Sequence, residues 1–244
     1  MRPFRALVLG AVLAASLTVA AADTLFTISA STSGVGSEKQ ESKETVWMGP
    51  GKLRHDGDEA TQIILAVEKK ALFIDHQEKT YSVVPLPVDL AKRVPADQRP
   101  MLDQLIAGMK MDVKVTPTDE RKKIRGWNVR KYAVALSTAT GMKLNVTVWT
   151  TTDLKVDAAA FKALSRDVSS MFPGAAQMAA EMDKIEGISV LTETSMAGSA
   201  FKRSQELLSV EEKAPPTGTY DPPAGYREAP FDPLARMRQE QQHP

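Results

Sequence analysis

The side chains that could carry acid–base or metal chemistry in this chain of 244 residues gather in one short stretch. His55, Asp56 and Asp58 precede Asp75 and His76, and the segments that hold them could lie side by side in a sheet. An imidazole beside a carboxylate can transfer protons or bind a metal ion. Aspartate is also common in turns, because its carboxylate accepts hydrogen bonds from nearby backbone N–H groups. We favour the turn interpretation, and we expect no catalytic residue, no metal site and no cofactor.

The composition narrows the function classes further. The chain has no cysteine and three histidines, which excludes disulfides, thiolate catalysis and cysteine-bound clusters. Lys and Arg number 31 against 30 Asp and Glu, a net charge of +1, so the basic excess typical of nucleic-acid binding is missing. Apolar residues make up 43% and charged residues 25%, as in ordinary globular proteins. We therefore expect a globular protein that does not bind nucleic acid.

The N-terminus has the three-part pattern of a secretory signal peptide. Arg2 and Arg5 supply positive charge, residues 6–22 are apolar or small, and Ala20 and Ala22 fit the last positions of a cleavage site. The apolar stretch is shorter than the ~20 residues of a membrane-spanning helix. We expect residues 1–22 to be the signal peptide, cleaved after Ala22, which leaves a periplasmic protein with no transmembrane segment in the mature chain.

A single domain is expected over residues 23–230, because one domain usually takes about 100–200 residues. From residue 214 onward this domain is rich in proline. The polar residues 231–244 are predicted to be a disordered tail.

Much of the body alternates apolar and polar residues, which predicts strands of an antiparallel sheet. Residues 63–67 are continuously apolar and predict a strand covered on both faces, whereas the polar residues 33–43 predict a loop or a frayed strand. The apolar positions change parity at Arg130-Lys131, which predicts a β-bulge there. The clearest hairpin is expected over residues 127–137 and 142–150.

Two blocks with apolar residues at helical spacing interrupt the strands. A helix is predicted over 101–109, and a second block runs from a cap at Asp157 to Pro173, with a further turn or two over 177–184. The pattern indicates an α+β fold, a curved antiparallel sheet of about ten strands with helices packed on one face. An apolar cavity is expected between sheet and helices. Its predicted lining comes from the apolar helix faces: Met101, Leu105, Met109, Phe161, Leu164, Val168 and Met171.

Two motifs carry a resemblance to a known superfamily. The segment WMGPGKLRHDG at residues 47–57 and the segment IDHQEKTY at residues 74–81 resemble strands of the periplasmic lipoprotein carriers, the LolA/LolB-like superfamily. The chain is most similar to an uncharacterised bacterial branch, a domain of unknown function, over most of residues 24–230. The resemblance implies an unclosed β-barrel with helices as a lid and an apolar cavity for acyl chains.

Two functions from different classes follow as hypotheses. The first is a non-catalytic binding or carrier protein that holds an acyl-bearing lipid or lipoprotein between sheet and helices. The alternative is a structural or interaction module of the cell envelope with a filled core. In that case the Pro-rich C-terminal segment with Tyr220, Tyr226 and Phe231 docks a partner or packs along the protein's own sheet. An enzyme would have to use His55, His76 and the nearby aspartates.

Overall fold

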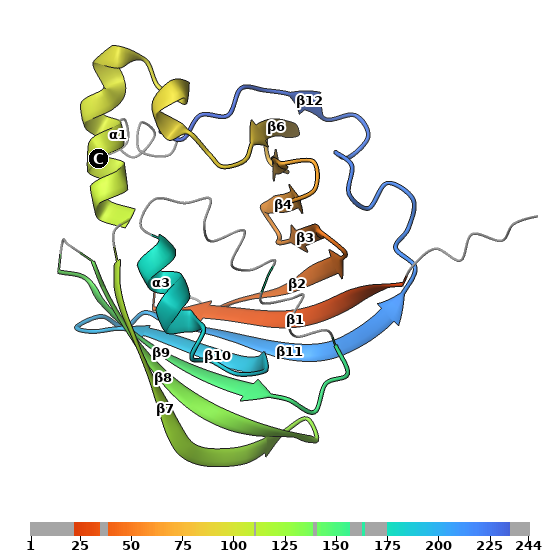
Figure 1. Cartoon of the computed structure of the whole chain (residues 1–244), viewed down its shortest axis with the longest axis vertical. Helices are drawn as coiled ribbons and strands as arrows, with labels where there is room; N and C mark the ends of the chain where they lie inside the picture. Colours follow the sequence, from red (N-terminus) through yellow and green to blue (C-terminus); the bar gives the residue numbers. More distant parts are fainter. Residues whose placement is uncertain are drawn as a thin grey trace, which may run out of the picture.

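The computed structural model describes residues 22–34, 39–109, 111–138, 141–156, 163 and 175–234. Twelve strands in this part of the chain form one open, strongly curved sheet (Figure 1). The spatial order is β12-β6-β5-β4-β3-β2-β1-β11-β10-β9-β8-β7, so β12 and β7 are the two edges. In chain order the strands are β1 (Asp23–Ser33), β2 (Gln40–Gly49), β3 (Lys52–Asp56), β4 (Ala60–Leu65), β5 (Lys70–Asp75), β6 (Thr80–Pro85), β7 (Met111–Ile124), β8 (Trp127–Thr138), β9 (Lys143–Thr151), β10 (Ile188–Met196), β11 (Lys202–Lys213) and β12 (Arg227–Glu228).

The sheet consists of two antiparallel runs that β1 joins. Short turns connect β2 to β6 on one side, and β7 to β11 follow one another on the other side. β1 pairs antiparallel with both β2 and β11, so that Leu25 lies opposite Trp47 and Glu211. This long-range pairing turns two local meanders into one sheet. β12 is an exception, because it pairs parallel to β6.

Strand periodicity predicts much of this arrangement correctly. The expected hairpin over 127–137 and 142–150 is β8 and β9, with Tyr132 opposite Val148. Residues 63–65 of the continuously apolar segment lie in β4, where Ile63 and Ile64 point to opposite faces and are both fully buried. Ala66 and the exposed Val67 instead lie in the turn that follows. A strand needs apolar residues at successive positions only when both of its faces are covered.

Two local expectations hold in part. Residues 40–43 belong to β2 and pair with β1, with Ser42 opposite Ala30, so the strand alternative predicted for residues 33–43 holds there and the loop alternative does not. The irregularity expected at Arg130-Lys131 lies on the partner strand, where the register shifts between Pro117 and Arg121. β8 itself pairs regularly with β9 through this stretch. Pro117 has no N–H to donate to the ladder, which makes a bulge favourable at that point.

The helices depart from the expected packing. α1 (Arg99–Met109) and α3 (Ala175–Met182) match the helices predicted over 101–109 and 177–184. α3 packs on β7, and the N–H of Val115 donates to the Glu181 carboxylate at 2.9 Å. α1 instead packs with the 3-10 helix η1 (Leu90–Arg93), beside η2 (Ala96–Gln98), and with the end of the chain. The part of the chain that the structure describes is therefore mostly sheet, with twelve strands rather than about ten. Within it, the expected packing of helices on one face holds for α3 but not for α1.

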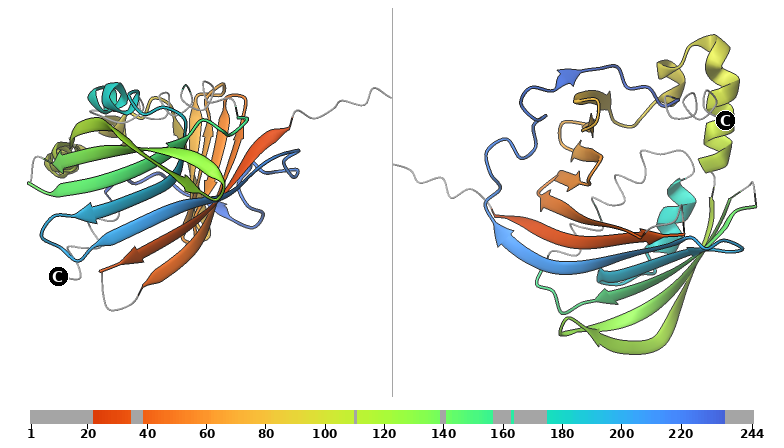
Figure 2. Two further views of the ribbon diagram at one scale, coloured as in Figure 1. Left: turned by 90° about the horizontal axis from the view of Figure 1, so that it is seen from below. Right: turned by 180° about the vertical axis from the view of Figure 1, so that it is seen from behind.

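Residues 214–234, which we call the C-terminal strap, run from β11 around the β6 edge of the sheet (Figures 1 and 2). Tyr220 and Tyr226 pack on a cluster that contains Leu72 and Ile74 of β5. Phe231 instead stacks on Phe73, with ring centroids 5.0 Å apart. Because neighbouring residues of a strand point to opposite faces, the strap contacts both faces of β5.

The end of the strap is held by apolar burial. Leu234 has 0% of its surface exposed and packs with Leu90, Val94 and Leu102. The packed chain therefore continues four residues beyond Pro230, where the sequence predicts a disordered tail to begin. Residues 235–244 lie outside the described residues.

Replacing Leu234 by alanine should lower the free energy of unfolding by about 2–5 kcal/mol, because the substitution leaves a cavity in a fully buried cluster. Urea unfolding followed by circular dichroism measures this loss. Val67→Ala is the matched control, since Val67 is 84% exposed and its truncation should change stability by about 0.5 kcal/mol or less. Equal stabilities of the wild type and Leu234→Ala would contradict the strap as a packed element.

Candidate functional site

The predicted cavity-lining residues fall into three groups. Met101 lies in α1, where it is half-buried against the cluster that contains Leu102 and Leu234. Leu105 and Met109 also lie in α1, but their side chains are not among those described. The remaining four lie outside the described residues: Phe161, Leu164, Val168 and Met171. The lining of an apolar cavity by these residues therefore stays a prediction.

The register of the strands identifies the side chains on the concave face. α3 lies inside the curve of the sheet in Figure 1, and Met178 and Ile185 pack with Tyr132 and Val148. Val146 is two residues from Val148 in β9, so it lies on the same face, and it is half-buried beside this cluster. The concave face thus carries apolar side chains that are only partly covered.

A buried charge interrupts this apolar surface. The carboxylate of Glu44, which is 5% exposed, accepts hydrogen bonds from Arg203 at 2.7 Å and from Gln205 at 3.0 Å. His55 Nε2 lies 3.1 Å from the same carboxylate. Gln205 pairs with Thr192, which pairs with Val148, so the cluster shares the concave face. A buried carboxylate with several donors avoids most of the cost of leaving water.

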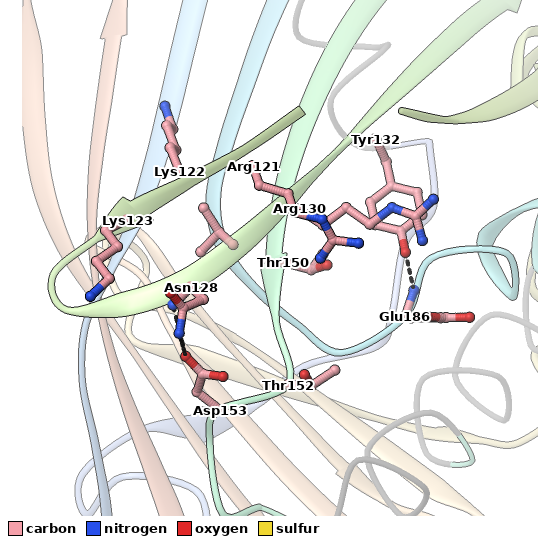
Figure 3. Close-up of a pocket in the computed structure, with 11 residues that line it drawn as sticks. Arg121, Lys122, Lys123, Asn128, Arg130, Tyr132, Thr150, Thr152, Asp153 and Glu186 are labelled. Atoms are coloured by element: carbon pink, nitrogen blue, oxygen red, sulfur yellow. Dashed lines mark hydrogen bonds between the residues drawn. The ribbon is translucent and has the colours of Figure 1, made fainter. Parts of the chain in front are cut away.

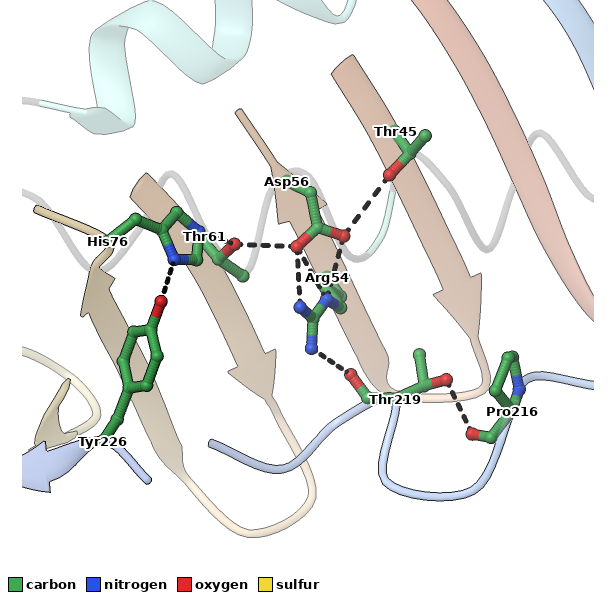
Figure 4. Close-up of polar contacts among 8 residues, drawn as sticks. All are labelled: Thr45, Arg54, Asp56, Thr61, His76, Pro216, Thr219 and Tyr226. Atoms are coloured by element: carbon green, nitrogen blue, oxygen red, sulfur yellow. Dashed lines mark hydrogen bonds and ion pairs between the residues drawn. The ribbon is translucent and has the colours of Figure 1, made fainter. Parts of the chain in front are cut away.

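The opposite, convex face carries a second polar network (Figure 4). Arg54 donates to the Asp56 carboxylate at 2.8 Å, and its Nη1 donates to the Thr219 carbonyl at 2.7 Å. Thr61 donates to Asp56 at 2.7 Å, and its oxygen lies 2.9 Å from His76 Nε2. Since the single hydroxyl proton of Thr61 points to Asp56, His76 Nε2 is the donor to Thr61.

His76 connects this network to the strap. Its Nδ1 lies 3.0 Å from the Tyr226 hydroxyl, within hydrogen-bond distance. Nearer the start of the strap, the Tyr220 hydroxyl donates to the buried Asp23 carboxylate at 2.7 Å. Burial and the Asp23 carboxylate both raise the pKa of Tyr220. The convex network therefore fastens the strap to β1 and to the β3–β5 strands.

The sequence cluster of two histidines and three aspartates does not form one site. His55 and Asp56 are neighbours in β3, so their side chains point to opposite faces of the sheet. His55 contacts Glu44 on the concave face, and His76 contacts Thr61 on the convex face. Asp75 follows the turn expectation, because its carboxylate accepts from the N–H of Glu78 at 2.8 Å. Among the described residues, no three His, Asp or Glu side chains gather as metal ligands would.

A pocket of about 500 Å³ lies at the β7–β9 end of the concave face (Figure 3). Four cationic side chains line it together with two carboxylates and several neutral polar groups: Arg121, Lys122, Lys123, Arg130, Asp153, Glu186, Asn128, Thr150, Thr152 and Tyr132. Asp153 accepts from the N–H and the side-chain amide of Asn128, at 2.7 and 3.0 Å. The N–H of Glu186 donates to the Tyr132 hydroxyl at 3.3 Å. This pocket is polar, which differs from the apolar cavity that the sequence predicts.

One position beside this pocket can be occupied only by glycine. Gly187 has a φ of +80°, and a Cβ there would collide with the backbone carbonyl of Thr151. Only glycine reaches that left-handed backbone conformation without strain and allows so close an approach. The turn that places Glu186 next to Tyr132 therefore depends on Gly187.

A second polar pocket of about 420 Å³ lies on the convex face, across β1, β11, β10 and β9. Ser31, Ser204, Glu193 and Thr147 form one cross-strand row in it. This row is on the face opposite Val148, because Thr147 and Val148 are neighbours in β9.

Sequence reasoning missed two features of these sites. The basic run Arg121-Lys122-Lys123 is visible in the sequence, but its pairing with Arg130 depends on the register of β7 on β8. Glu44 has a clearer signal, because it shares its parity with the apolar Val46 and Met48 of the same strand. A charged residue at an apolar position predicts a buried ion pair.

The fold and sites define a class of protein with an open, strongly curved, mostly antiparallel sheet and polar pockets on both faces. The model of the DUF4412 family, a domain of unknown function, matches residues 35–226. That match covers most of the chain, and the protein belongs to this family. No curated protein matches the sequence.

Several solved structures are similar to the chain. PNGF-II has 16% sequence identity and a TM-score of 0.44, covering 90% of this chain and 33% of its own, so this chain spans about a third of PNGF-II. A LolA superfamily protein from Nitrosomonas europaea has 7% identity and a TM-score of 0.30, covering 81% and 89%. A putative outer membrane lipoprotein-sorting protein domain from Vibrio parahaemolyticus has 6% identity and a TM-score of 0.35, covering 82% and 89%. The LolA superfamily is the one that the sequence motifs resemble.

The convex network predicts an acid-sensitive contribution to stability. Burial alone would raise the pKa of Asp56, but the hydrogen bonds and charge of Arg54, with Thr61 and Thr45, outweigh it and lower that pKa. A carboxyl with a lowered pKa in the folded state stabilises the protein above about pH 3.9, its unfolded pKa, and the contribution is lost as the pH falls through the folded value. Asp56→Asn should therefore cost about 1–3 kcal/mol at pH 7 and progressively less in acid.

Urea unfolding of the wild type and Asp56→Asn between pH 3 and pH 7 measures this difference. Asp58→Asn is the control, because Asp58 is exposed in the next turn and its substitution should have little effect at any pH. A penalty for Asp56→Asn that stays constant or grows in acid would show that the carboxylate does not act in this way.

Proposed function

We propose that this protein is an exported, non-catalytic binding or carrier protein that holds an acyl-bearing lipid or lipoprotein against the concave face of its sheet. The observation that carries the proposal is the curved, open sheet of twelve strands with half-buried apolar side chains on that face. Side chains alone can fill the interior of a β-barrel of about eight strands, whereas a barrel with more strands encloses space for a ligand. The proposed ligand would gain about 0.8 kcal/mol for each CH₂ group that leaves water.

The separation of the two histidines supports a binding rather than a catalytic role. An acid–base site needs its groups within hydrogen-bond reach of one substrate, and His55 and His76 lie on opposite faces. The Thr61 hydroxyl that contacts His76 belongs to a residue that is only 1% exposed.

The alternative of a partner-docking C-terminal segment is weakened by the strap. Tyr220, Tyr226 and Phe231, the residues proposed to dock a partner, contact Asp23, His76 and Phe73 of the protein's own sheet. Packing along the sheet is thus the role that the described part of this segment supports.

An acyl site on the concave face can be tested with two neighbouring residues of β9. Val146→Gln places a polar group on the concave face, and Thr147→Gln changes the convex face of the same strand. Burying an amide against an acyl chain without a partner costs about 1–3 kcal/mol, so Val146→Gln should weaken the uptake of a fluorescent fatty acid about tenfold, while Thr147→Gln leaves it unchanged. No uptake by the wild type, or equal uptake by all three proteins, would contradict the proposal.

Export can be tested by sequencing the N-terminus of protein purified from the periplasm. β1 begins at Asp23, the first residue after the predicted cleavage site. We expect the mature chain to begin at Asp23. Among the described residues no helix has the length and apolarity to cross a membrane. Recovery of the intact chain from the cytoplasm alone would contradict this part of the proposal.

A further inference from the structure

Two arginines face each other across the floor of the β7–β9 pocket. Arg121 of β7 lies directly opposite Arg130 of β8, and Arg130 lies opposite Thr150 of β9. The three side chains therefore form one row on the same face of the sheet (Figure 3). Like charges directly opposite each other on neighbouring strands are unfavourable. This row thus concentrates positive charge at the expense of local stability.

The protein itself neutralises this charge only in part. Arg130 donates through Nε to the Thr118 carbonyl at 3.0 Å and lies 5.4 Å from the centre of the Tyr132 ring. Arg121 makes no hydrogen bond or ion pair with any residue that the structure describes. Neither contact of Arg130 supplies a negative charge, so both guanidinium groups keep their full positive charge.

The two carboxylates of the pocket are directed elsewhere. Asp153 is bonded to Asn128. The side chain of Glu186 points away from both guanidinium groups in Figure 3. With four cationic and two acidic side chains, the lining carries a net charge of about +2. Lys122 lies over the Trp149 ring at 4.0 Å, and Lys123 lies opposite Asn128 rather than opposite another cation. The two arginines are direct cross-strand partners, which makes them the pair best placed to bind one anion.

We propose that this pocket binds a phosphate group through Arg121 and Arg130, with the Thr150 hydroxyl as a further donor. A guanidinium offers paired N–H donors that match two oxygens of a phosphate. A doubly charged phosphate can accept hydrogen bonds from two guanidinium groups at once, and its negative charge reduces the electrostatic repulsion between them. The pocket volume of about 500 Å³ leaves room for the group that carries the phosphate.

The bound phosphate is either the headgroup of a lipid or a free phosphate. Only the lipid alternative rests on the proposed function. The phosphate site itself is inferred from the positions of the two arginines and does not require an acyl ligand. A lipid headgroup here would place the acyl chains along the concave face, where Val146 lies beside α3. A free phosphate would bind without any lipid.

The test measures phosphate binding by isothermal titration calorimetry at constant ionic strength, with chloride as the competing anion. Arg121→Gln and the double variant Arg121→Gln/Arg130→Gln remove the proposed contacts. Arg227→Gln is the matched control, because Arg227 lies in β12 at the opposite edge of the sheet. We expect the double variant to bind phosphate at least about tenfold more weakly than the wild type and the control to bind equally well. Circular dichroism verifies folding, and exposed Arg121 offers a single variant if the double variant does not fold.

A second arm uses vesicles of phosphatidylcholine with and without phosphatidic acid. If the wild type binds free phosphate and Arg121→Gln weakens this binding, the proposal is supported and the ligand is a soluble phosphate. If the wild type binds vesicles with phosphatidic acid but not free phosphate, and Arg121→Gln weakens this binding, the proposal is supported and the ligand is a lipid headgroup. No phosphate-dependent binding in either arm, or equal binding by the double variant, would overturn it. Fatty-acid uptake by the wild type and the double variant is measured in parallel. Normal uptake by both would show that the proposed acyl site is intact even if the phosphate proposal is overturned.

Discussion

Main-chain hydrogen bonds from the C-terminal strap to β6 and the turn before it close one edge of the open sheet. Arg227 N donates to the Lys79 carbonyl at 3.1 Å and Ala229 N to the Tyr81 carbonyl at 2.8 Å. An open sheet leaves unpaired N–H and C=O groups at its edges. These groups can pair with a strand of another chain unless a further segment of the protein covers them. The strap covers the β6 edge, adds apolar side chains to both faces of β5, and ends in the cluster that holds α1. The other edge, β7, is protected differently, by Pro117, by a register shift and by charged side chains.

The alternation of side chains along each strand separates the two faces by function. On the convex face, Arg54, Asp56 and His76 hold the strap in place. On the concave face, partly covered apolar residues lie near α3, the Glu44 cluster lies farther along the sheet, and the arginine row lies at the β7–β9 end. A single strand such as β3 therefore contributes His55 to one face and Asp56 to the other. An acyl chain with a phosphate headgroup would meet both kinds of surface that the concave face offers.

Much of the fold could be predicted from the sequence, because local periodicity determines hairpins and short helices. The β8–β9 hairpin, the doubly covered β4 and the helix at 101–109 all follow from apolar spacing. The pairing of β1 with β11 could not be predicted in this way, since it joins residues up to 190 positions apart, such as Asp23 and Lys213. The strap has no periodic pattern either, and its aromatic residues fit a docking tail as well as a packed one. The facing arginines depend on register, which a bulge at Pro117 shifts.

Native mass spectrometry of protein purified from the periplasm can detect an acyl ligand bound to the concave face. Solvent extraction and lipid analysis of the same sample identify the bound molecule. If the concave face binds an acyl ligand, the measured mass should exceed that of the chain from Asp23 to Pro244 by the mass of an acyl lipid recovered in the extract. A mass equal to the bare chain, together with no binding of added fatty acid, would contradict it.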